Sequence, residues 1–325
     1  MTEPLSLACV ATDRTRPLLD GRVRIAGAEV AFAPGEPEAI FRRALREQAF
    51  AITELSMASH ILTTARGTSS YLGIPVWPSR AFRHGAVFIR TDRGIATPQD
   101  LAGRTIGVPE YQMTAAVWVR EILRSAYGVD TGSIRWRTGG LVQPNIDERI
   151  ALSLPPGHDV APIAPGETLD ALLEAGAIDA YVGPRPPPCI GRGAPIRRLF
   201  ADVRGEEARW FRASGFFPIM HCIAIRRDVA EANPTLSRAI FAAFSAAKQA
   251  AEADLAQVNV LRVALPWAAE HWAETRALMG PDPWAYGFAR NRAEIATMIA
   301  AARADGLIDR AIAPETLFHP DTLDL

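Results

Sequence analysis

Short apolar runs separated by longer amphipathic stretches recur along the whole chain. Apolar and polar residues roughly alternate over residues 5–10, which predicts a first strand. Residues 37–48 carry Ile40, Phe41, Ala44 and Leu45 on one helical face. Similar patterns predict strands at residues 50–52, 71–76, 86–89, 104–108, 134–136, 180–182 and 217–225. They predict helices at residues 56–65, 114–127, 169–175, 234–256, 267–279 and 291–306. Strands that alternate with helices are typical of the α/β class.

Turn-forming residues mark the connections. Gly27 separates two apolar stretches, residues 23–25 and 28–32, which predicts a hairpin-like pair. Residues 138–168 are rich in Gly and Pro and predict a long surface excursion. Four prolines within residues 184–188 predict a stiff loop.

The predicted strands divide into two groups along the chain. Residues 91–205 lie between strands that belong with the two termini. We therefore expect a discontinuous first domain of residues 1–90 and 206–325, with residues 91–205 inserted as a second α/β domain. Small ligands commonly bind between domains, so we expect a central ligand cleft.

Composition narrows the class of protein. Of the 325 residues, 49% are hydrophobic and 22% are charged, which is typical of a globular protein and not of a disordered chain. The formal net charge is -1, so no basic field indicates a nucleic-acid partner. No apolar run approaches the ~20 residues that span a bilayer, so we expect no membrane segment.

The cysteines indicate the compartment. Cys9, Cys189 and Cys222 are scattered and form no CxxC motif, which is typical neither of a disulfide framework nor of a zinc site. The chain starts without the basic segment and apolar run of a secretory signal. Together these features predict a cytoplasmic protein.

Charged residues follow two of the predicted strands. Glu54 comes after residues 50–52, and Arg14 and Arg16 come after the first strand. In open α/β sheets the carboxyl ends of the strands border the ligand crevice, so we expect these side chains near a ligand. Two arginines suit a dicarboxylate, because Arg binds carboxylates through paired hydrogen bonds. A solvated loop for the arginines and a helix cap for Glu54 are the alternatives.

Two histidines are candidates for proton transfer. His84 follows Arg83 beside a predicted strand, and His221 lies within the apolar residues 217–225. A buried imidazole needs a hydrogen-bond partner, so a structural role is the alternative for each. We expect both histidines on one wall of the cleft, with Glu54 beside one of them to fix its tautomer and raise its pKa.

The helix predicted to begin at Thr114 offers an anion site. A helix N-terminus carries partial positive charge and unsatisfied N–H groups, so it can hold a carboxylate. Tyr111, which precedes it, can stack on a ring. An ordinary cap is the alternative for Thr114.

Motifs for metals, nucleotides and nucleophilic hydrolysis are missing from the sequence. Glu54, His60, His84 and His221 could converge, but no HxH, HExxH or CxxC spacing supports a divalent metal, so we expect none. GxGxxG, GxxxxGK(S/T) and GxSxG are also absent. We therefore expect neither a phosphate-binding loop nor a hydrolase nucleophile.

Several segments resemble the 4,5-dihydroxyphthalate decarboxylase family. The most specific are residues 110–120, Glu-Tyr-Gln-Met-Thr-Ala-Ala-Val-Trp-Val-Arg, and residues 217–221, Phe-Pro-Ile-Met-His. Other matching segments are residues 13–23, 54–56, 78–84, 107–109, 139–144, 179–180, 184–185, 274–276, 284–287 and 306–307. The resemblance implies a type II periplasmic-binding-protein-like fold.

The resemblance also implies a cofactor-independent carboxy-lyase acting on a dihydroxyphthalate-like aromatic dicarboxylate. From 4,5-dihydroxyphthalate the products would be protocatechuate and carbon dioxide. A base such as His221 would deprotonate a ring hydroxyl, and an acid, His84 or Glu54, would deliver the ring proton. The substrate-binding residues would be Arg14, Arg16, Arg83, Tyr111 and Thr114.

Other functions fit the same fold. A solute-binding protein for an aromatic or other small carboxylate is the main alternative, and an enzyme related to thiamine-pyrimidine synthases or futalosine-pathway enzymes is another. One fold hosts many functions, so the fold alone does not decide among them. A homo-oligomer is compatible with each.

Overall fold

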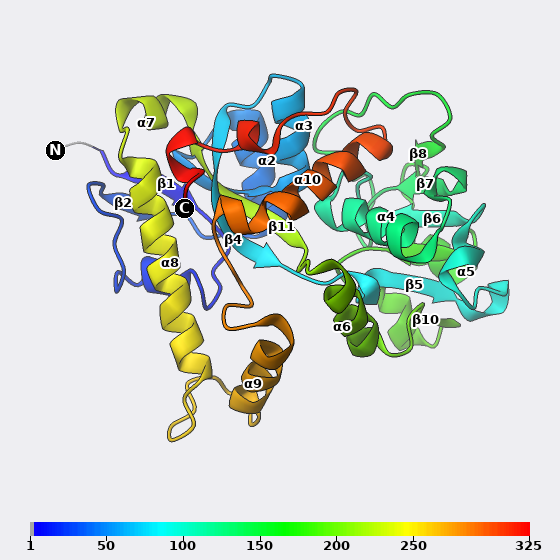
Figure 1. Cartoon of the computed structure of the whole chain (residues 1–325). Coiled ribbons are helices and arrows are strands. Elements are labelled where there is room, and N and C mark those ends of the chain that lie inside the picture. The colour runs from blue at the N-terminus through cyan, green and yellow to red at the C-terminus, as the bar shows by residue number, and fades with distance from the viewer. Residues whose placement is uncertain (1–2) are drawn as a thin grey trace. The chain divides into compact units, whose positions relative to one another are not determined.

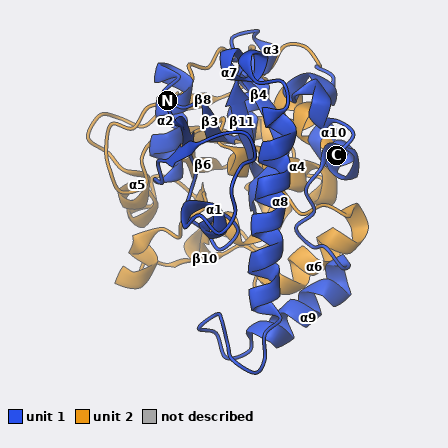
Figure 2. Ribbon diagram, turned by 90° about the vertical axis from the view of Figure 1, so that its left-hand side faces the viewer, with its two compact units in different colours: residues 1–80, 219–296, 312–325 blue, residues 81–218, 297–311 orange. Residues whose placement is uncertain are grey.

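The computed structural model describes residues 3–325, which form two compact units (Figures 1 and 2). Unit 1 contains residues 3–80, 219–296 and 312–325. Unit 2 contains residues 81–218 and 297–311. Unit 2 is therefore inserted into unit 1 and also takes a second, later segment of the chain.

The boundaries between the two units differ from those expected from the sequence, which lay after residue 90 and after residue 205. Residues 81–90 and 206–218 lie in unit 2. Strand β5 (Val87–Arg90) explains the first of these, because it pairs with two strands of unit 2. Helix α10 (Phe288–Ala304) carries residues of both units, since the division falls within it.

Unit 1 is built on a five-stranded sheet with the order β2-β1-β3-β11-β4. Its strands are β1 (Leu5–Ala8), β2 (Val30–Phe32), β3 (Ile52–Ser56), β4 (Tyr71–Arg80) and β11 (Ile219–Arg226). Strands β1, β2 and β3 are parallel, whereas β11 runs antiparallel to β3 and β4. Strand β3 is buried at all five positions, as expected of a central strand covered on both faces.

The helices of unit 1 connect and cover these strands (Figure 1). They are α1 (Arg16–Leu19), α2 (Pro37–Glu47), α3 (Met57–Ala65), α7 (Arg227–Ala232), α8 (Leu236–Leu255) and α9 (Ala268–Met279), with the first part of α10. Helix α2 packs against β3 and buries Ile40, Phe41 and Ala44 of the predicted face, whereas Leu45 is only partly buried. Helix α8 packs against β4.

Unit 2 has a six-stranded sheet with the order β10-β5-β9-β6-β7-β8. Its further strands are β6 (Thr105–Val108), β7 (Arg135–Thr138), β8 (Val160–Pro162), β9 (Ala180–Val182) and β10 (Ile196–Arg198). Its helices are α4 (Thr114–Tyr127), α5 (Leu169–Ala175) and α6 (Val203–Ser214). Strand β5 runs antiparallel to both its neighbours, β10 and β9, and the other three strand pairs are parallel. Most of this sheet is therefore parallel, and the α/β class is confirmed.

Several predicted elements differ from the structure. The hairpin about Gly27 is wrong, because residues 30–32 form β2 and pair in parallel with β1. The strand predicted at residues 50–52 continues to Ser56 as β3. Helix α6 and strand β10 have no counterpart in the prediction. Within residues 3–325 no helix is both long enough and apolar enough to cross a membrane.

Candidate active site

Glu54 and His221 lie on neighbouring strands of unit 1 and contact each other. In the β3–β11 ladder Glu54 stands opposite Ile223, and His221 stands opposite Ser56. Residues two apart on a strand share a face, so Glu54 and His221 are diagonal neighbours on one face of the sheet. Long side chains meet at this spacing, and His221 Nδ1 lies 2.6 Å from Glu54 Oε1.

The Glu54 carboxylate is buried and held at both oxygens. Its side chain is 1% exposed, and Oε2 accepts a hydrogen bond of 2.8 Å from the backbone N–H of Val10. A buried carboxylate requires such donors, because an unpaired buried charge is strongly unfavourable. The expectation that Glu54 follows its strand is wrong, since the buried strand runs on through Ser56.

His221 is oriented by Glu54 and by an aromatic neighbour. The Phe41 ring meets the imidazole edge to face, with centroids 4.8 Å apart. With Nδ1 facing the carboxylate, Nε2 is the nitrogen that remains for a ligand. The His221 side chain is 18% exposed, so part of the ring is accessible. Glu54 therefore lies beside one of the two candidate histidines, as expected.

Arg14 is fixed in the loop that follows β1. Its guanidinium lies 4.0 Å from the centre of the Trp284 ring and 2.6 Å from the carboxylate of Asp13. It also donates a hydrogen bond of 3.2 Å to the carbonyl of Pro78, which directly precedes the β4 partner of His221. These contacts hold the Arg14 guanidinium next to Ser79, the β4 residue that pairs with His221.

Arg16 does not share this arrangement. It begins α1, and its side chain is exposed. The two arginines that stand close together in the sequence thus have different surroundings, one held over an indole ring and one in solvent.

His84 lies in unit 2 and is surrounded by aromatic rings. Its side chain is 1% exposed, and the rings of Phe200, Trp210 and Tyr127 lie 5.3, 5.8 and 6.1 Å away between centroids. Within residues 3–325 neither ring nitrogen has a hydrogen-bond partner, and burial lowers the pKa of His84 to about 4. At neutral pH this imidazole is uncharged.

The expectation that His84 shares the domain of His221 is therefore corrected. His84 does follow β4, the neighbour of the strand that carries His221, but it lies in unit 2, directly before β5 of that unit's sheet. The carboxylate expected beside one of the two histidines lies at His221, whereas the His84 ring is packed among aromatic rings.

Arg83 and Thr114 also belong to unit 2. Burial lowers the pKa of Arg83 to about 10, against the opposing effect of Glu207. Thr114 is the first residue of α4 with Met113 at the N-cap position, so Thr114 is not the cap of that helix. Their arrangement relative to Arg14 stays a prediction.

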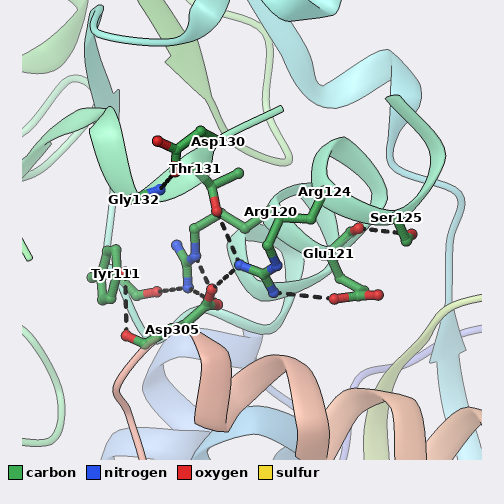
Figure 3. Close-up of polar contacts among 9 residues, drawn as sticks. All are labelled: Tyr111, Arg120, Glu121, Arg124, Ser125, Asp130, Thr131, Gly132 and Asp305. Carbon is green, nitrogen blue, oxygen red and sulfur yellow. Dashed lines mark hydrogen bonds and ion pairs between the residues drawn. The ribbon is translucent and has the colours of Figure 1, made fainter. Parts of the chain in front are cut away.

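Tyr111 takes part in an ionic network inside unit 2 (Figure 3). The Arg120 guanidinium lies 3.9 Å from the centre of the Tyr111 ring, and the Tyr111 hydroxyl donates to the carbonyl of Asp305 at 3.3 Å. Arg120 and Arg124 bind the Asp305 carboxylate at 2.7 and 2.5 Å. One face of the Tyr111 ring is thus covered by Arg120, which the sequence alone does not indicate.

Three groups that contact Glu54, His221 and Arg14 were not foreseen. Val10 contributes a backbone N–H to Glu54, Phe41 packs edge to face with the His221 ring, and the Trp284 ring lies under the Arg14 guanidinium. Backbone groups carry no residue signal, and the ring contacts depend on tertiary packing. The segment of residues 284–287, which contributes to the family resemblance, is the one signal that points to Trp284.

No metal-binding cluster accompanies this pair. Among residues 3–325 no group of three or more His, Cys, Asp and Glu side chains is placed to hold a metal ion. The residues that can do chemistry here are the buried Glu54, the partly exposed His221 and the anchored Arg14.

Two curated proteins are similar to this chain over much of its length. A protein of Comamonas testosteroni named 4,5-dihydroxyphthalate decarboxylase is 44% identical over 321 residues, which cover 98% of this chain and 97% of that protein. A protein of Pseudomonas putida with the same name is 44% identical over 213 residues, covering 65% of this chain and 83% of its own. No protein-family model matches the chain.

Solved structures show the fold. The periplasmic aliphatic sulphonate binding protein SsuA of Escherichia coli covers 100% of both chains with a TM-score of 0.58 and 14% identity. The ligand binding component of an ABC-type import system of Staphylococcus aureus covers 99% of this chain and 98% of its own, with a TM-score of 0.56 and 10% identity. The periplasmic-binding-protein-like fold is thereby confirmed.

Proposed function

This chain belongs to the 4,5-dihydroxyphthalate decarboxylase family, and on that premise we propose that it is a carboxy-lyase. It removes one carboxylate from 4,5-dihydroxyphthalate and yields protocatechuate and carbon dioxide. The observation that carries this conclusion is the identity of 44% over 98% of the chain. The fold alone would suit a solute-binding protein equally well.

The reaction requires electrons to move from a ring hydroxyl to the carbon that loses its carboxylate. The hydroxyl para to the departing group supplies them once it is deprotonated. A proton then bonds to that carbon, the bond to the carboxylate breaks, and carbon dioxide leaves as aromaticity returns. The ring oxygen is then a phenolate, and it takes one proton from water to become a hydroxyl again. Overall one proton replaces the carboxylate, and no electron is gained or lost. We therefore propose that the reaction uses neither an organic cofactor nor a metal.

We assign the proton transfer to His221. Its Nε2 takes the hydroxyl proton, and the resulting imidazolium returns a proton to the ring carbon. Glu54 holds Nδ1 at 2.6 Å and stabilises the imidazolium. Glu54 itself does not reach the substrate, because it is 1% exposed and engaged at both oxygens. Proton transfer by a positioned side chain contributes about 10²–10⁴ in rate.

We assign the carboxylate that stays on the ring to Arg14. The guanidinium is anchored by Trp284 and the Pro78 carbonyl, and its side chain is 19% exposed. Binding through a pre-positioned cation costs little side-chain entropy. The exposed Arg16 is not needed for this role.

The unit 2 residues Arg83, Tyr111 and Thr114 stay proposed contributors to substrate binding. His84 is a poor candidate for the ring-proton donor, because burial lowers its pKa to about 4. If His84 contacts the substrate, it does so as an uncharged imidazole.

The compartment and the partner are also proposals. The substrate is a small aromatic dicarboxylate. Cys9, Cys189 and Cys222 are all free thiols, which suits the reducing cytoplasm, and we propose that the enzyme works there.

The test is incubation of the purified protein with 4,5-dihydroxyphthalate, followed by chromatography for protocatechuate and detection of carbon dioxide. Phthalate, which has no hydroxyl, is the matched control and should not react. We expect 4-hydroxyphthalate to lose only the carboxylate para to its hydroxyl. Binding of 4,5-dihydroxyphthalate without release of carbon dioxide would identify a solute-binding protein instead.

A further inference from the structure

The hydroxyl of Thr15 closes the loop that carries Val10. Thr15 is 0% exposed, and its Oγ1 donates a hydrogen bond of 2.7 Å to the Val10 carbonyl. The same oxygen accepts a hydrogen bond of 2.8 Å from the backbone N–H of Thr12. One buried hydroxyl therefore ties two backbone groups of residues 10–12 together.

The Thr15 hydroxyl does not cap the helix that begins after it. Thr15 occupies the N-cap of α1, yet its side chain makes no capping hydrogen bond to that helix. An N-cap Thr ordinarily accepts a hydrogen bond from a backbone N–H of the first helical turn. Here the side chain turns back to Val10 instead.

Val10 is held on both sides of its α-carbon. Its carbonyl accepts from Thr15, and its N–H donates to Glu54 Oε2 at 2.8 Å. The other oxygen of Glu54 faces His221 Nδ1 at 2.6 Å. A continuous series of short polar contacts thus joins the Thr15 hydroxyl to the imidazole.

We propose that Thr15 is a positioning residue for the Glu54–His221 pair. It acts through the Val10 backbone and touches neither the substrate nor the reacting atoms. Without its hydroxyl, the Val10 carbonyl loses its partner and the Val10 N–H loses its fixed direction. Glu54 then keeps one of its two fixed donors, and the imidazole is no longer held in one orientation. The inference rests on the proposed decarboxylase function.

The test compares Thr15→Val, which removes the hydroxyl at nearly constant shape, with Thr15→Ser, which keeps it. We expect Thr15→Val to lower kcat for 4,5-dihydroxyphthalate by about 10-fold or more, the effect of one lost hydrogen bond, with KM changed less than about threefold. Thr15→Ser should stay within about threefold of the parent protein. Thr15→Ala, which leaves space beside the carbonyl, serves if the valine variant does not fold.

Thr322→Val is the matched control. Thr322 is also 0% exposed in unit 1, and its hydroxyl donates a hydrogen bond of 2.8 Å to the His319 carbonyl. We expect this variant to lose stability and keep kcat. Normal kcat in a folded Thr15→Val or Thr15→Ala, or an equal loss in Thr15→Ser or Thr322→Val, would overturn the proposal.

A second readout separates this inference from the proposed function. The ¹⁵N chemical shifts of the His221 ring report which nitrogen carries the proton, and they need no substrate. We expect them to change in Thr15→Val and not in Thr322→Val. If the parent protein does not decarboxylate 4,5-dihydroxyphthalate, the proposed function fails, whereas unchanged shifts in Thr15→Val overturn the positioning role alone.

Discussion

The two side chains that meet at the candidate site are 167 positions apart in the sequence. Glu54 and His221 were each recognisable as candidates, since a carboxylate next to a buried strand and a histidine inside one both need a partner. Their contact depends on the register of β3 against β11, which no local pattern specifies. The sequence also could not separate His84 from His221, because aromatic packing around a histidine is a tertiary property.

Replacing His221 tests the reactive group directly. We expect His221→Gln to lower kcat by about 100-fold or more, because the amide cannot exchange a proton with the substrate. The control is His60→Gln, which changes a second imidazole of unit 1, a buried one whose Nε2 lies 2.7 Å from the Leu317 carbonyl oxygen. Steady-state kinetics on folded proteins measure both. Turnover of His221→Gln close to that of the parent protein would contradict the assignment.

The buried His84 should make stability depend on pH. Its pKa is about 4 when folded and 6.5 as the ordinary value, so between these pH values the unfolded chain binds more protons. Stability is therefore lost as the pH falls from 6.5 towards 4. The nearby charges partly oppose each other, since Glu206 raises this pKa and Arg209 lowers it.

His84→Phe removes this titration and keeps an aromatic ring among the others. Between pH 7 and pH 5 we expect the variant to lose about 2 kcal/mol less free energy of unfolding than the parent protein. Urea unfolding at the two pH values measures this. Equal losses would show that His84 is not the titrating group, and a turnover reduced 100-fold would return it to the list of proton donors.

At the scale of elements, helices with clear ends were predictable. Helices α4 and α5 run over the expected residues, because each combines an apolar face with a glycine in the left-handed region just after it, Gly128 at φ 64° and Gly176 at φ 76°. Helix α6 was missed because only Trp210 of its twelve residues is buried, which leaves no apolar face to detect.

Long-range strand pairing was less predictable. Strand β2 pairs in parallel with β1, whereas a glycine between apolar stretches suggested a local hairpin. Strand β10 is short, with two exposed arginines at the edge of its sheet. The sequence thus indicated β2 as a strand but not its partner, and β10 lacks the alternation from which strands are recognised.

Gly73 shows how one strand position limits packing. A Cβ there would lie 2.8 Å from both the Leu317 carbonyl oxygen and the Phe318 ring. We expect Gly73→Ala to lower the free energy of unfolding by about 1–3 kcal/mol, because backbone and a buried ring must move. The control is Gly191→Ala, where no atom lies within 4 Å of the new carbon. Urea unfolding compares the two, and equal stability of both variants would contradict the expectation.

At the scale of the whole molecule, the α/β class and the discontinuous chain path were recognisable from the order of strands and helices. The sequence did not indicate that residues 297–311 belong to unit 2. An amphipathic helical pattern shows that one face is buried, but it does not show against which domain that face packs. Asp305 explains this placement. Its side chain is 1% exposed and binds Arg120 and Arg124 of α4.

Removing this buried charge should be costly. We expect Asp305→Asn to lower the free energy of unfolding by about 3–5 kcal/mol, because Arg120 is then left buried without its counter-charge. Glu315→Gln is the control, since the Arg292–Glu315 pair is 56% and 36% exposed and should contribute less than about 1 kcal/mol. Calorimetry of both variants measures the difference. A stable Asp305→Asn would contradict the role assigned to the network.

The later segment of unit 2 has a consequence for biosynthesis. The ribosome makes a protein from its N-terminus, and domains generally fold as their residues emerge. Arg124 is made 181 residues before Asp305, the residue whose carboxylate it binds. Unit 2 therefore cannot reach its final packing until residue 305 has been synthesised, and Arg120 and Arg124 have no carboxylate partner until then. A nascent chain halted before residue 305 should be open to protease at α4.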